Sequence, residues 1–423
     1  MKTSLALSSS RRNGRVRFAA GRRAVALTAI LLVIAILAGC GQNVTPSPSP
    51  TVAPSATSAP VSKATASPTA TAAPVVKATA DPSQAKWDST VAAGKQEGEI
   101  LAYFNAPSSA IEAIPAAFTK KFGIKMNVVV GNAAELTARV NTEYRANLHQ
   151  VDVILVGSST LWTNVASNGF LAPVKPILIL PEVTDGTKWR GGQLPLFDKK
   201  GQVLSYLAQV IPPIVYSTDF VKHGQVTSYN DLLKPEWKDK IVMFDPTVGG
   251  AAQFGITTLN FQWSLDRAKQ YLSSLLTQQN AVIVRDQGQQ MDWVSKGKYS
   301  IALWPQTPAV AQYLSAGVPL GSADIQEQKA ASASNGGLAV GVSPAHPNAT
   351  ATFVNWFLSQ EGQALAVQTM GAPSTRVDVP TTGVADMFII KPGSQVIMQN
   401  EELTVLQSTL VDGWKQVIAA AAK

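Results

Sequence analysis

Three strand–turn–helix units in succession, between residues 99 and 168, constrain the fold more than any other feature. Short apolar strands are predicted at 99–104, 125–130 and 151–156. Each leads through a small polar turn into a segment whose apolar residues recur at helical spacing. Consecutive units of this kind favour a parallel sheet covered by helices, so we expect an α/β protein.

The strand–turn–helix order recurs later in the chain. Apolar strands are predicted at 241–244, 281–284 and 299–304, and each precedes a predicted helix. Between the two series lies an apolar stretch, 202–216, that Pro212 and Pro213 interrupt. Two prolines suit a passage between lobes better than a central strand. A strand at 338–342, opened by Gly336 and Gly337, is predicted to be the return crossover.

Small polar residues stand where the strands of the first series end. In parallel sheets, ligands bind at the carboxyl ends of strands. Free N–H groups at the helix N-termini that follow suit carboxylate, phosphate or hydroxyl groups. Each residue also has a simpler interpretation as a helix cap or turn former. The candidate ligand-binding residues of this lobe are Asn105, Ser108, Asn132, Ser158 and Ser159.

The second series and the C-terminal part supply candidates with charged or aromatic side chains. Arg285 ends a strand and can hold a carboxylate or phosphate in a bidentate manner; Arg376 is a weaker candidate for the same role. Asp245 can meet an ammonium or hydroxyl group, or cap the next helix. Trp304 can stack on a ligand or pack in a core. The remaining candidate ligand-binding residues are Thr247, Gln306 and Asn335.

The N-terminal region carries targeting signals rather than a fold. Seven basic residues and no acidic one precede an apolar run, Ala24–Ala38, and Cys40, the single cysteine, stands two residues after it. This pattern predicts a signal peptide over 1–39. The segment 40–83 is almost entirely Pro, Ser, Thr, Ala and Val, and is predicted to be a disordered spacer.

Charge and motif content narrow the classes of function. The chain has a formal net charge of +8, but without the seven basic residues before Cys40 it is nearly neutral, which gives no reason to expect a nucleic-acid partner. Three scattered histidines match no metal-ligand spacing, and no Gly-x-Ser-x-Gly motif is present. We therefore expect neither a bound metal or cofactor nor an enzyme, although paired carboxylates for a surface enzyme cannot be recognised from sequence.

Several short motifs together resemble a known family. They lie at 94–99, 118–125 and 151–153, then at 235–241 and 245–246, and finally at 345–349, 353–356 and 359–363. Their content and order resemble bacterial extracellular solute-binding proteins of ABC importers, and most closely the iron(III)-type branch. The tetrapeptide ending at Cys40 resembles a lipobox, which implies lipid attachment at Cys40 and an extracytoplasmic, membrane-anchored protein.

The resemblance implies a type II periplasmic-binding-protein fold. That fold has two lobes, each a mostly parallel sheet flanked by helices, joined by two crossover segments with a solute between them. The expected division is 84–213 for the first lobe, 214–337 for the second, and 338–423 for the return to the first lobe with the C-terminal helices. Expected partners are a small-molecule solute and an ABC permease with its ATPase, and the expected state is a monomer.

One departure from the branch bears on the ligand. Ferric binders have adjacent tyrosines where this chain has Trp304-Pro305-Gln306-Thr307, and phenolate oxygens are what Fe³⁺ requires. The expected ligand is therefore a small organic anion, such as a phosphonate, a phosphorylated metabolite or a carboxylate. Ferric iron, thiamine and polyamines remain alternatives within the family. A surface enzyme or a ligand-sensing subunit is the alternative from another class.

Overall fold

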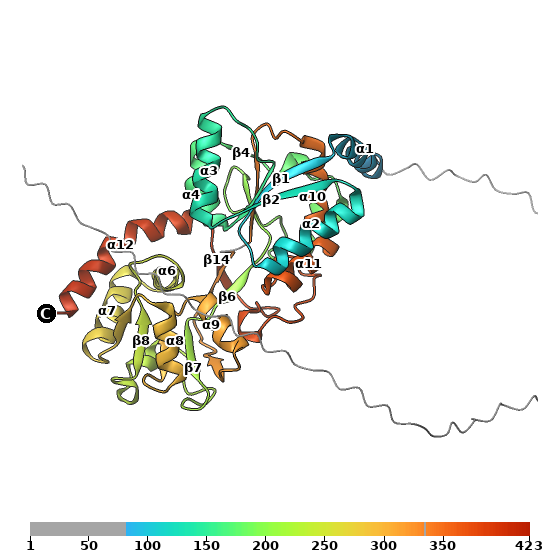
Figure 1. Cartoon of the computed structure of the whole chain (residues 1–423). Coiled ribbons are helices and arrows are strands. Elements are labelled where there is room, and N and C mark those ends of the chain that lie inside the picture. The colour runs from blue at the N-terminus through green and yellow to red at the C-terminus, as the bar shows by residue number, and fades with distance from the viewer. Residues whose placement is uncertain (1–81, 334–335) are drawn as a thin grey trace, which may run out of the picture. The chain divides into compact units, whose positions relative to one another are not determined.

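The computed structural model describes residues 82–333 and 336–423. The predicted signal peptide, Cys40, almost all of the predicted spacer, and Asn335 therefore lie outside the described residues. The described residues all belong to one compact unit. Within it, two helix-covered sheets form two lobes, and a small third sheet lies between them (Figure 1).

The first lobe is built on a six-stranded sheet in the order β2-β1-β3-β13-β4, with β5 also paired to β13. β1 runs parallel to β2 and β3, whereas β13 is antiparallel to β3, β4 and β5. The α/β expectation is thus confirmed, and the sheet is mixed, because β13 runs against the direction that the other strands share. The strands are β1 (Glu99–Phe104), β2 (Lys125–Val130), β3 (Val153–Val156), β4 (Leu171–Ala172), β5 (Val203–Ser205) and β13 (Gly337–Gly341).

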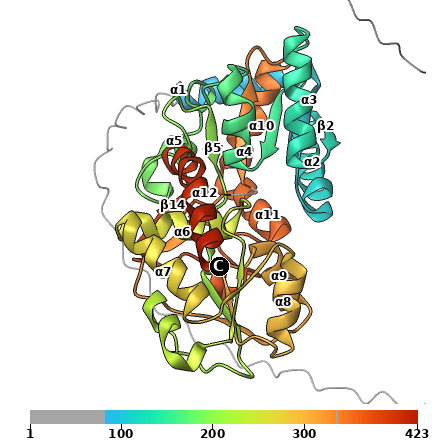
Figure 2. The ribbon, with the colours of Figure 1, turned by 90° about the vertical axis from the view of Figure 1, so that its left-hand side faces the viewer.

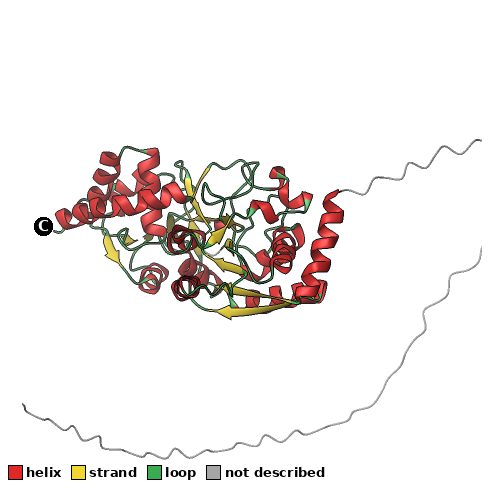
Figure 3. Ribbon diagram, turned by 90° about the horizontal axis from the view of Figure 1, so that it is seen from above, coloured by secondary structure: helices red, strands yellow, loops and turns green. Residues whose placement is uncertain are grey.

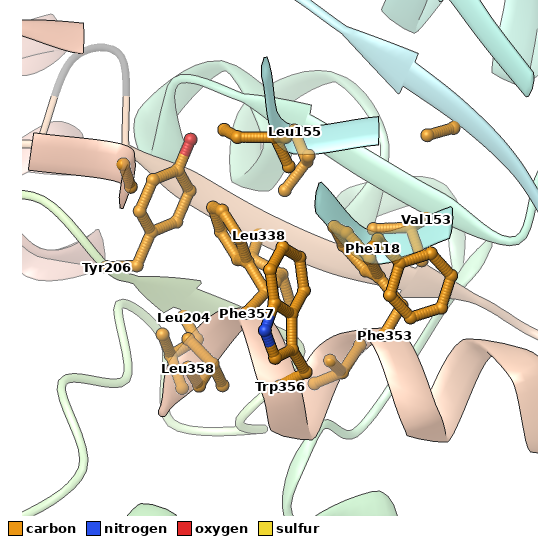
Figure 4. Close-up of a cluster of buried hydrophobic side chains, with 14 of the residues drawn as sticks. Phe118, Val153, Leu155, Leu204, Tyr206, Leu338, Phe353, Trp356, Phe357 and Leu358 are labelled. Carbon is orange, nitrogen blue, oxygen red and sulfur yellow. The ribbon is translucent and has the colours of Figure 1, made fainter. Parts of the chain in front are cut away.

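Helices cover this sheet and bury an aromatic core. Phe118 packs edge-on against Phe353, and Trp356 lies beside both (Figure 4). These rings come from segments that are far apart in the chain, so the lobe closes only when its C-terminal part returns. The helices are α1 (Pro82–Glu97), α2 (Ser108–Phe122), α3 (Ala133–Arg145), α4 (Ser158–Asn164), α5 (Pro181–Thr184), α10 (Pro347–Leu358) and α11 (Gln360–Met370).

The second lobe repeats this architecture on a five-stranded sheet in the order β11-β7-β10-β8-β9. β8 is parallel to β9 and β10, and β7 is antiparallel to β10 and β11. Its strands are β7 (Ile214–Ser217), β8 (Ile241–Phe244), β9 (Val282–Val284), β10 (Ile301–Leu303) and β11 (Leu320–Ser322). Its helices are α6 (Ala251–Gln262), α7 (Leu265–Thr277), α8 (Gln287–Ser295), α9 (Thr307–Ser315) and α12 (Glu401–Ala421).

The crossing region differs in detail from the prediction. The stretch 202–216 contains β5 of the first lobe, β6 (Gln209–Ile211) of the small sheet and β7 of the second lobe. The chain returns along β12 (Lys329–Ser332), which pairs with β6, whereas the strand predicted as the crossover is β13 of the first lobe. β14 (Val396–Met398) adds a third crossing strand. β12 is short and rich in Ala and Ser, so it carries no apolar pattern to reveal it.

Short 3₁₀ helices connect these elements. Figure 3 shows the helices lying around the strands, with loops between them. Among the described residues, no helix has both the length and the apolar content needed to cross a bilayer. The 3₁₀ helices are Ala166–Asn168, Lys175–Ile177, Gly186–Lys188, Tyr229–Leu233, Pro235–Trp237 and Asp386–Phe388.

Candidate functional site

A polar cleft of about 530 Å³ lies where the two lobes face each other. The start of α4 forms its first-lobe side, and the starts of α6 and α9 form its second-lobe side. The crossing strands and α12 complete the lining. The polar lining residues are Ser159, Thr160, Thr163, Asn164, Gln253, Gln306, Thr307, Ser332, Gln399, Thr404, Gln407 and Ser408.

A smaller hollow of about 240 Å³ adjoins this cleft, since Thr307, Pro308 and Ser332 line both. It is more apolar, with Leu207, Met370 and Phe388 among its lining residues. No charged side chain and no tyrosine stands among the residues that line either space. The chemistry offered to a ligand is therefore that of hydroxyl groups, amides and small apolar surfaces.

Of the first-lobe candidates, Ser159 lines the cleft. Its neighbour Ser158 is buried, and its Oγ is 2.8 Å from Ser205 Oγ, so that hydroxyl joins α4 to β5. Because consecutive residues at a helix N-terminus point in different directions, only one of this pair can face the ligand.

The other first-lobe candidates have local partners. Asn132 caps α3: its side chain accepts a hydrogen bond from Glu135 N at 2.9 Å, and the Glu135 carboxylate accepts one from Asn132 N. Asn105 Nδ2 donates to the Gly131 carbonyl at 3.0 Å. Ser108 begins α2 and is exposed, next to Pro107, which lines the smaller hollow. For Asn132 the capping interpretation accounts for every contact that its side chain makes.

Asp245 and Arg285 form an ion pair where β8 and β9 end. Arg285 Nε lies 2.8 Å from Asp245 Oδ2, while the other carboxylate oxygen accepts hydrogen bonds from the backbone N and Oγ1 of Thr247. Burial alone would raise the pKa of Asp245, but these hydrogen bonds and the guanidinium charge outweigh it and lower that pKa. Asp245 is therefore a buried, paired carboxylate.

Trp304 does not offer a ring to the cleft. Its side chain is fully buried in the core of the second lobe, and its Nε1 donates to Tyr229 Oη at 3.2 Å. A Cβ on Gly255 of α6 would collide with the indole, so that glycine makes room for the ring. The stacking interpretation of Trp304 is corrected accordingly: the residue packs, and it stands at a strained φ of 50° just before the cleft loop.

Gln306 holds two cleft loops together. Its Oε1 accepts a hydrogen bond from Ala251 N at 3.1 Å, and its Nε2 lies 3.4 Å from the Gly249 carbonyl. Gly250, with a φ of 81°, leaves space for this amide, since a Cβ there would lie 2.5 Å from it. The start of α6 and the start of α9 are thereby fixed relative to each other.

Arg376 is a structural residue. Its guanidinium is buried, pairs with Asp378 and Glu182, and donates to the Glu182 and Leu358 carbonyls. It lies over the Trp189 ring in the first lobe. All of its charge is used inside the protein, so it is not an anion clamp.

Sequence reasoning missed most of the polar lining. Thr160, Thr163 and Asn164 follow Ser159 on α4, and their spacing alone could have placed them on its face. Gln253, Ser332, Gln399 and Gln407 carry no comparable signal, since they reach the cleft from four separate segments.

The described residues give little support for direct metal binding. They contain no group of three or more His, Cys, Asp or Glu side chains placed to hold an ion. All eight tyrosines are described, and none lines the cleft or the adjoining hollow. The donor set there consists of neutral oxygens and amides, which is a weak match for Fe³⁺.

Comparisons with known proteins agree with this architecture. The family model for bacterial extracellular solute-binding proteins matches residues 113–388. Iron uptake protein A1 of Synechocystis is 27% identical over 150 residues, which is 36% of this chain and 38% of that protein. The match thus spans well under half of the curated relative.

Solved structures share the fold at low identity. An iron- and citrate-bound protein from Trichodesmium has a TM-score of 0.59 and 18% identity, over 77% of this chain and 99% of that one. A fructose-6-phosphate-bound periplasmic binding protein from Actinobacillus pleuropneumoniae has a TM-score of 0.55 and 18% identity, over 75% and 99%. Two lobes, a polar cleft between them and a family match over most of the body lead to one conclusion: this chain belongs to the bacterial extracellular solute-binding proteins.

Proposed function

We propose that this protein captures a small, oxygen-rich organic anion in its interlobe cleft and delivers it to an ABC permease and ATPase. Sugar phosphates and hydroxycarboxylates are the classes that fit best. The observation that carries this proposal is the lining itself, in which hydroxyl and amide groups from both lobes converge without an opposing charge. Such groups bind ligand oxygens by hydrogen bonds and fix orientation.

We assign the anionic end of the ligand to Arg285, which is not among the residues that line the cleft and would meet the ligand at the edge of that space. Only its Nε is engaged by Asp245, and neither terminal guanidinium nitrogen has a partner among the described residues. The side chain is largely exposed at the end of β9, beside the strand whose following loop lines the cleft. A guanidinium with two free nitrogens can grip a carboxylate or phosphate.

A cationic solute fits less well. Asp245 was the expected counter-charge, but Arg285 already neutralises it and Thr247 occupies its other oxygen. Trp304, the expected aromatic partner for a thiamine or polyamine cation, is buried, and Phe254 is the aromatic residue among those that line the cleft.

Iron remains a candidate only as part of an anionic chelate. A complex of Fe³⁺ with a hydroxycarboxylate would present carboxylate and hydroxyl oxygens to the cleft, so the metal would need no phenolate from this chain. The Trichodesmium structure, which holds iron with citrate, motivates this second candidate.

Solute binding is proposed to close the two lobes around the ligand. Three short crossing strands join the lobes, and a ligand held from both sides favours the closed arrangement by its higher affinity for it. The proposed setting is outside the cytoplasm, with lipid on Cys40 as the anchor and the 40–83 segment as the spacer.

The proposal is tested by identifying what the cleft holds. The full chain, extracted from membranes, is examined by native mass spectrometry for a co-purifying solute, and fructose 6-phosphate, citrate and ferric citrate are titrated by calorimetry. Ser159→Trp should fill the cleft and abolish binding, whereas Ser167→Trp, at an exposed position in the same lobe, should not. Undiminished binding by Ser159→Trp would show that the solute binds elsewhere.

A further inference from the structure

The C-terminal helix α12 forms a wall of the cleft although it lies beyond residues 113–388, the part that matches the family. It packs along α6 and α7 of the second lobe, close to α4 of the first (Figure 2). Trp414 anchors it, because that side chain is fully buried in the second-lobe core. The position of α12 is thus fixed by the lobe that carries it.

The start of α12 is also tied to the first lobe. Glu401 N donates to the Phe197 carbonyl at 3.1 Å, and Lys199 Nζ lies 2.6 Å from Glu402 Oε1. Asn400 caps the helix by accepting a hydrogen bond from Leu403 N at 2.9 Å. Consequently, the first turns of α12 are held where both lobes meet.

One face of these turns is turned toward the cleft. Thr404, Gln407 and Ser408 are spaced by three and four residues, which places them on the same side of a helix, and all three line the cleft. All three are uncharged hydrogen-bonding residues. No other part of α12 among the described residues lines this space.

Gln407 occupies the most defined position on this face. Its side-chain Oε1 lies 3.5 Å from Gln399 Nε2, and its backbone carbonyl lies 3.4 Å from Gln253 Nε2. Gln399 in turn accepts a hydrogen bond at its Oε1 from Ser332 Oγ, at 2.7 Å. The side chain is largely buried within this network. Its Nε2 has no hydrogen-bond partner among the described residues, so this amide is free to donate to a ligand in the cleft.

We propose that α12 determines which solute the cleft accepts, with Gln407 as the specificity-determining residue. Its Nε2 donates to a hydroxyl oxygen of the bound molecule, and Thr404 and Ser408 flank that contact. A glutamine amide is neutral, so it adds no charge attraction for the anion, but it can donate a hydrogen bond to a hydroxyl oxygen. The α12 face therefore favours hydroxylated anions over simple ones. This inference rests on the proposed function, in which Arg285 supplies the charge recognition.

The test compares two probes on the full chain by calorimetry: fructose 6-phosphate, and inorganic phosphate measured by its competition with fructose 6-phosphate. Gln407→Leu should lower the affinity for fructose 6-phosphate about tenfold, as expected for one lost hydrogen bond, and leave that for phosphate unchanged. Thr404→Val should shift the same ratio in the same direction. Gln326→Leu, an exposed glutamine away from the cleft, is the matched control and should change neither affinity.

The outcomes separate this inference from the proposed function. Suppose that Ser159→Trp abolishes binding while Gln407→Leu and Thr404→Val bind both probes like the wild type. Then α12 does not determine which solute the cleft accepts, and the proposed function stands. An equal loss for both probes would likewise overturn the inference, because it indicates a general distortion. If fructose 6-phosphate does not bind the wild type, the proposal that the ligand is a sugar phosphate fails, and this inference fails with it.

Discussion

Arg285 Nε lies 2.8 Å from Asp245 Oδ2, in a pair whose two members differ sharply in environment. The Asp245 side chain is 5% exposed and the Arg285 side chain 72% exposed. The pair therefore neutralises a buried carboxylate at the end of β8 while leaving the terminal nitrogens of the guanidinium toward solvent. This one contact therefore gives the buried Asp245 carboxylate a counter-charge and still leaves the Arg285 guanidinium available to a ligand.

Replacing Arg285 should weaken the binding of an anionic solute. Arg285→Ala is expected to cost about 1.5–3 kcal/mol of affinity, the range for hydrogen bonds to charged groups. The loss of folding stability should be about 1 kcal/mol, because the arginine is solvated and Thr247 still donates two hydrogen bonds to the Asp245 carboxylate. Calorimetry with fructose 6-phosphate or citrate measures the first effect and urea unfolding the second. Arg145→Ala, an exposed arginine of α3, is the control. Equal affinity of wild type and Arg285→Ala would remove Arg285 from the site.

Asp245 should make the stability of the protein depend on pH. Its pKa is lowered below the ordinary value of 3.8, so its ionised form stabilises the folded state. This contribution is complete above about pH 4 and is lost as the pH falls through the lowered pKa. Asp245→Asn should therefore unfold more easily than the wild type at pH 7, and the difference should shrink below pH 4. A difference that grows in acid, measured by urea unfolding at several pH values, would contradict this account.

Ser158 and Ser159 should have opposite roles despite being neighbours. Ser158→Ala leaves Ser205 Oγ buried without its partner, which is expected to cost about 1–3 kcal/mol of stability, with little effect on affinity. Ser159→Ala removes a hydroxyl from the cleft lining and should reduce affinity while stability stays within about 0.5 kcal/mol. Chemical unfolding and calorimetry of both variants give the comparison. The reverse pattern would mean that the cleft lies on the other side of α4.

Trp304 should act through packing. Trp304→Phe removes part of a fully buried ring and should lower the free energy of unfolding by about 1–3 kcal/mol. Trp293→Phe, at a partly exposed ring of α8, should change it by about 0.5 kcal/mol or less. If Trp304→Phe instead kept its stability and lost solute affinity, the ring would have to contact the ligand after all.

Cys40 should decide whether the protein stays on the membrane. Cys40→Ser removes the only thiol, so no lipid can be attached and the protein should appear in the soluble extracytoplasmic fraction. Ser47→Ala in the adjoining spacer should leave membrane retention unchanged. Cell fractionation with immunoblotting provides the measurement. Retention of Cys40→Ser on the membrane would point to an anchor other than lipid on this residue.

Much of the fold could be predicted because short apolar runs and helical spacing of apolar residues indicate its strands and helices. The strands at 99–104, 125–130 and 241–244 were predicted at their observed bounds, since short apolar runs bounded by Gly, Asn or Asp are strong signals. Helix α7 and the crossing strand β12 were not among the predicted elements. β12 is stabilised by pairing with β6 and β14, and such pairing leaves no periodicity in a four-residue strand.

The sequence by itself, with the family resemblance it carries, predicted a two-lobed α/β body whose strands end in polar turns. Only the tertiary structure decided which polar side chains meet. It turned Ser159 toward the cleft and Ser158 toward Ser205, and it buried Trp304. It also brought Gln407 to Gln253 across 154 residues of chain. Spacing along the chain fixes which face of one element a residue occupies, whereas the packing of separate elements decides what that face meets.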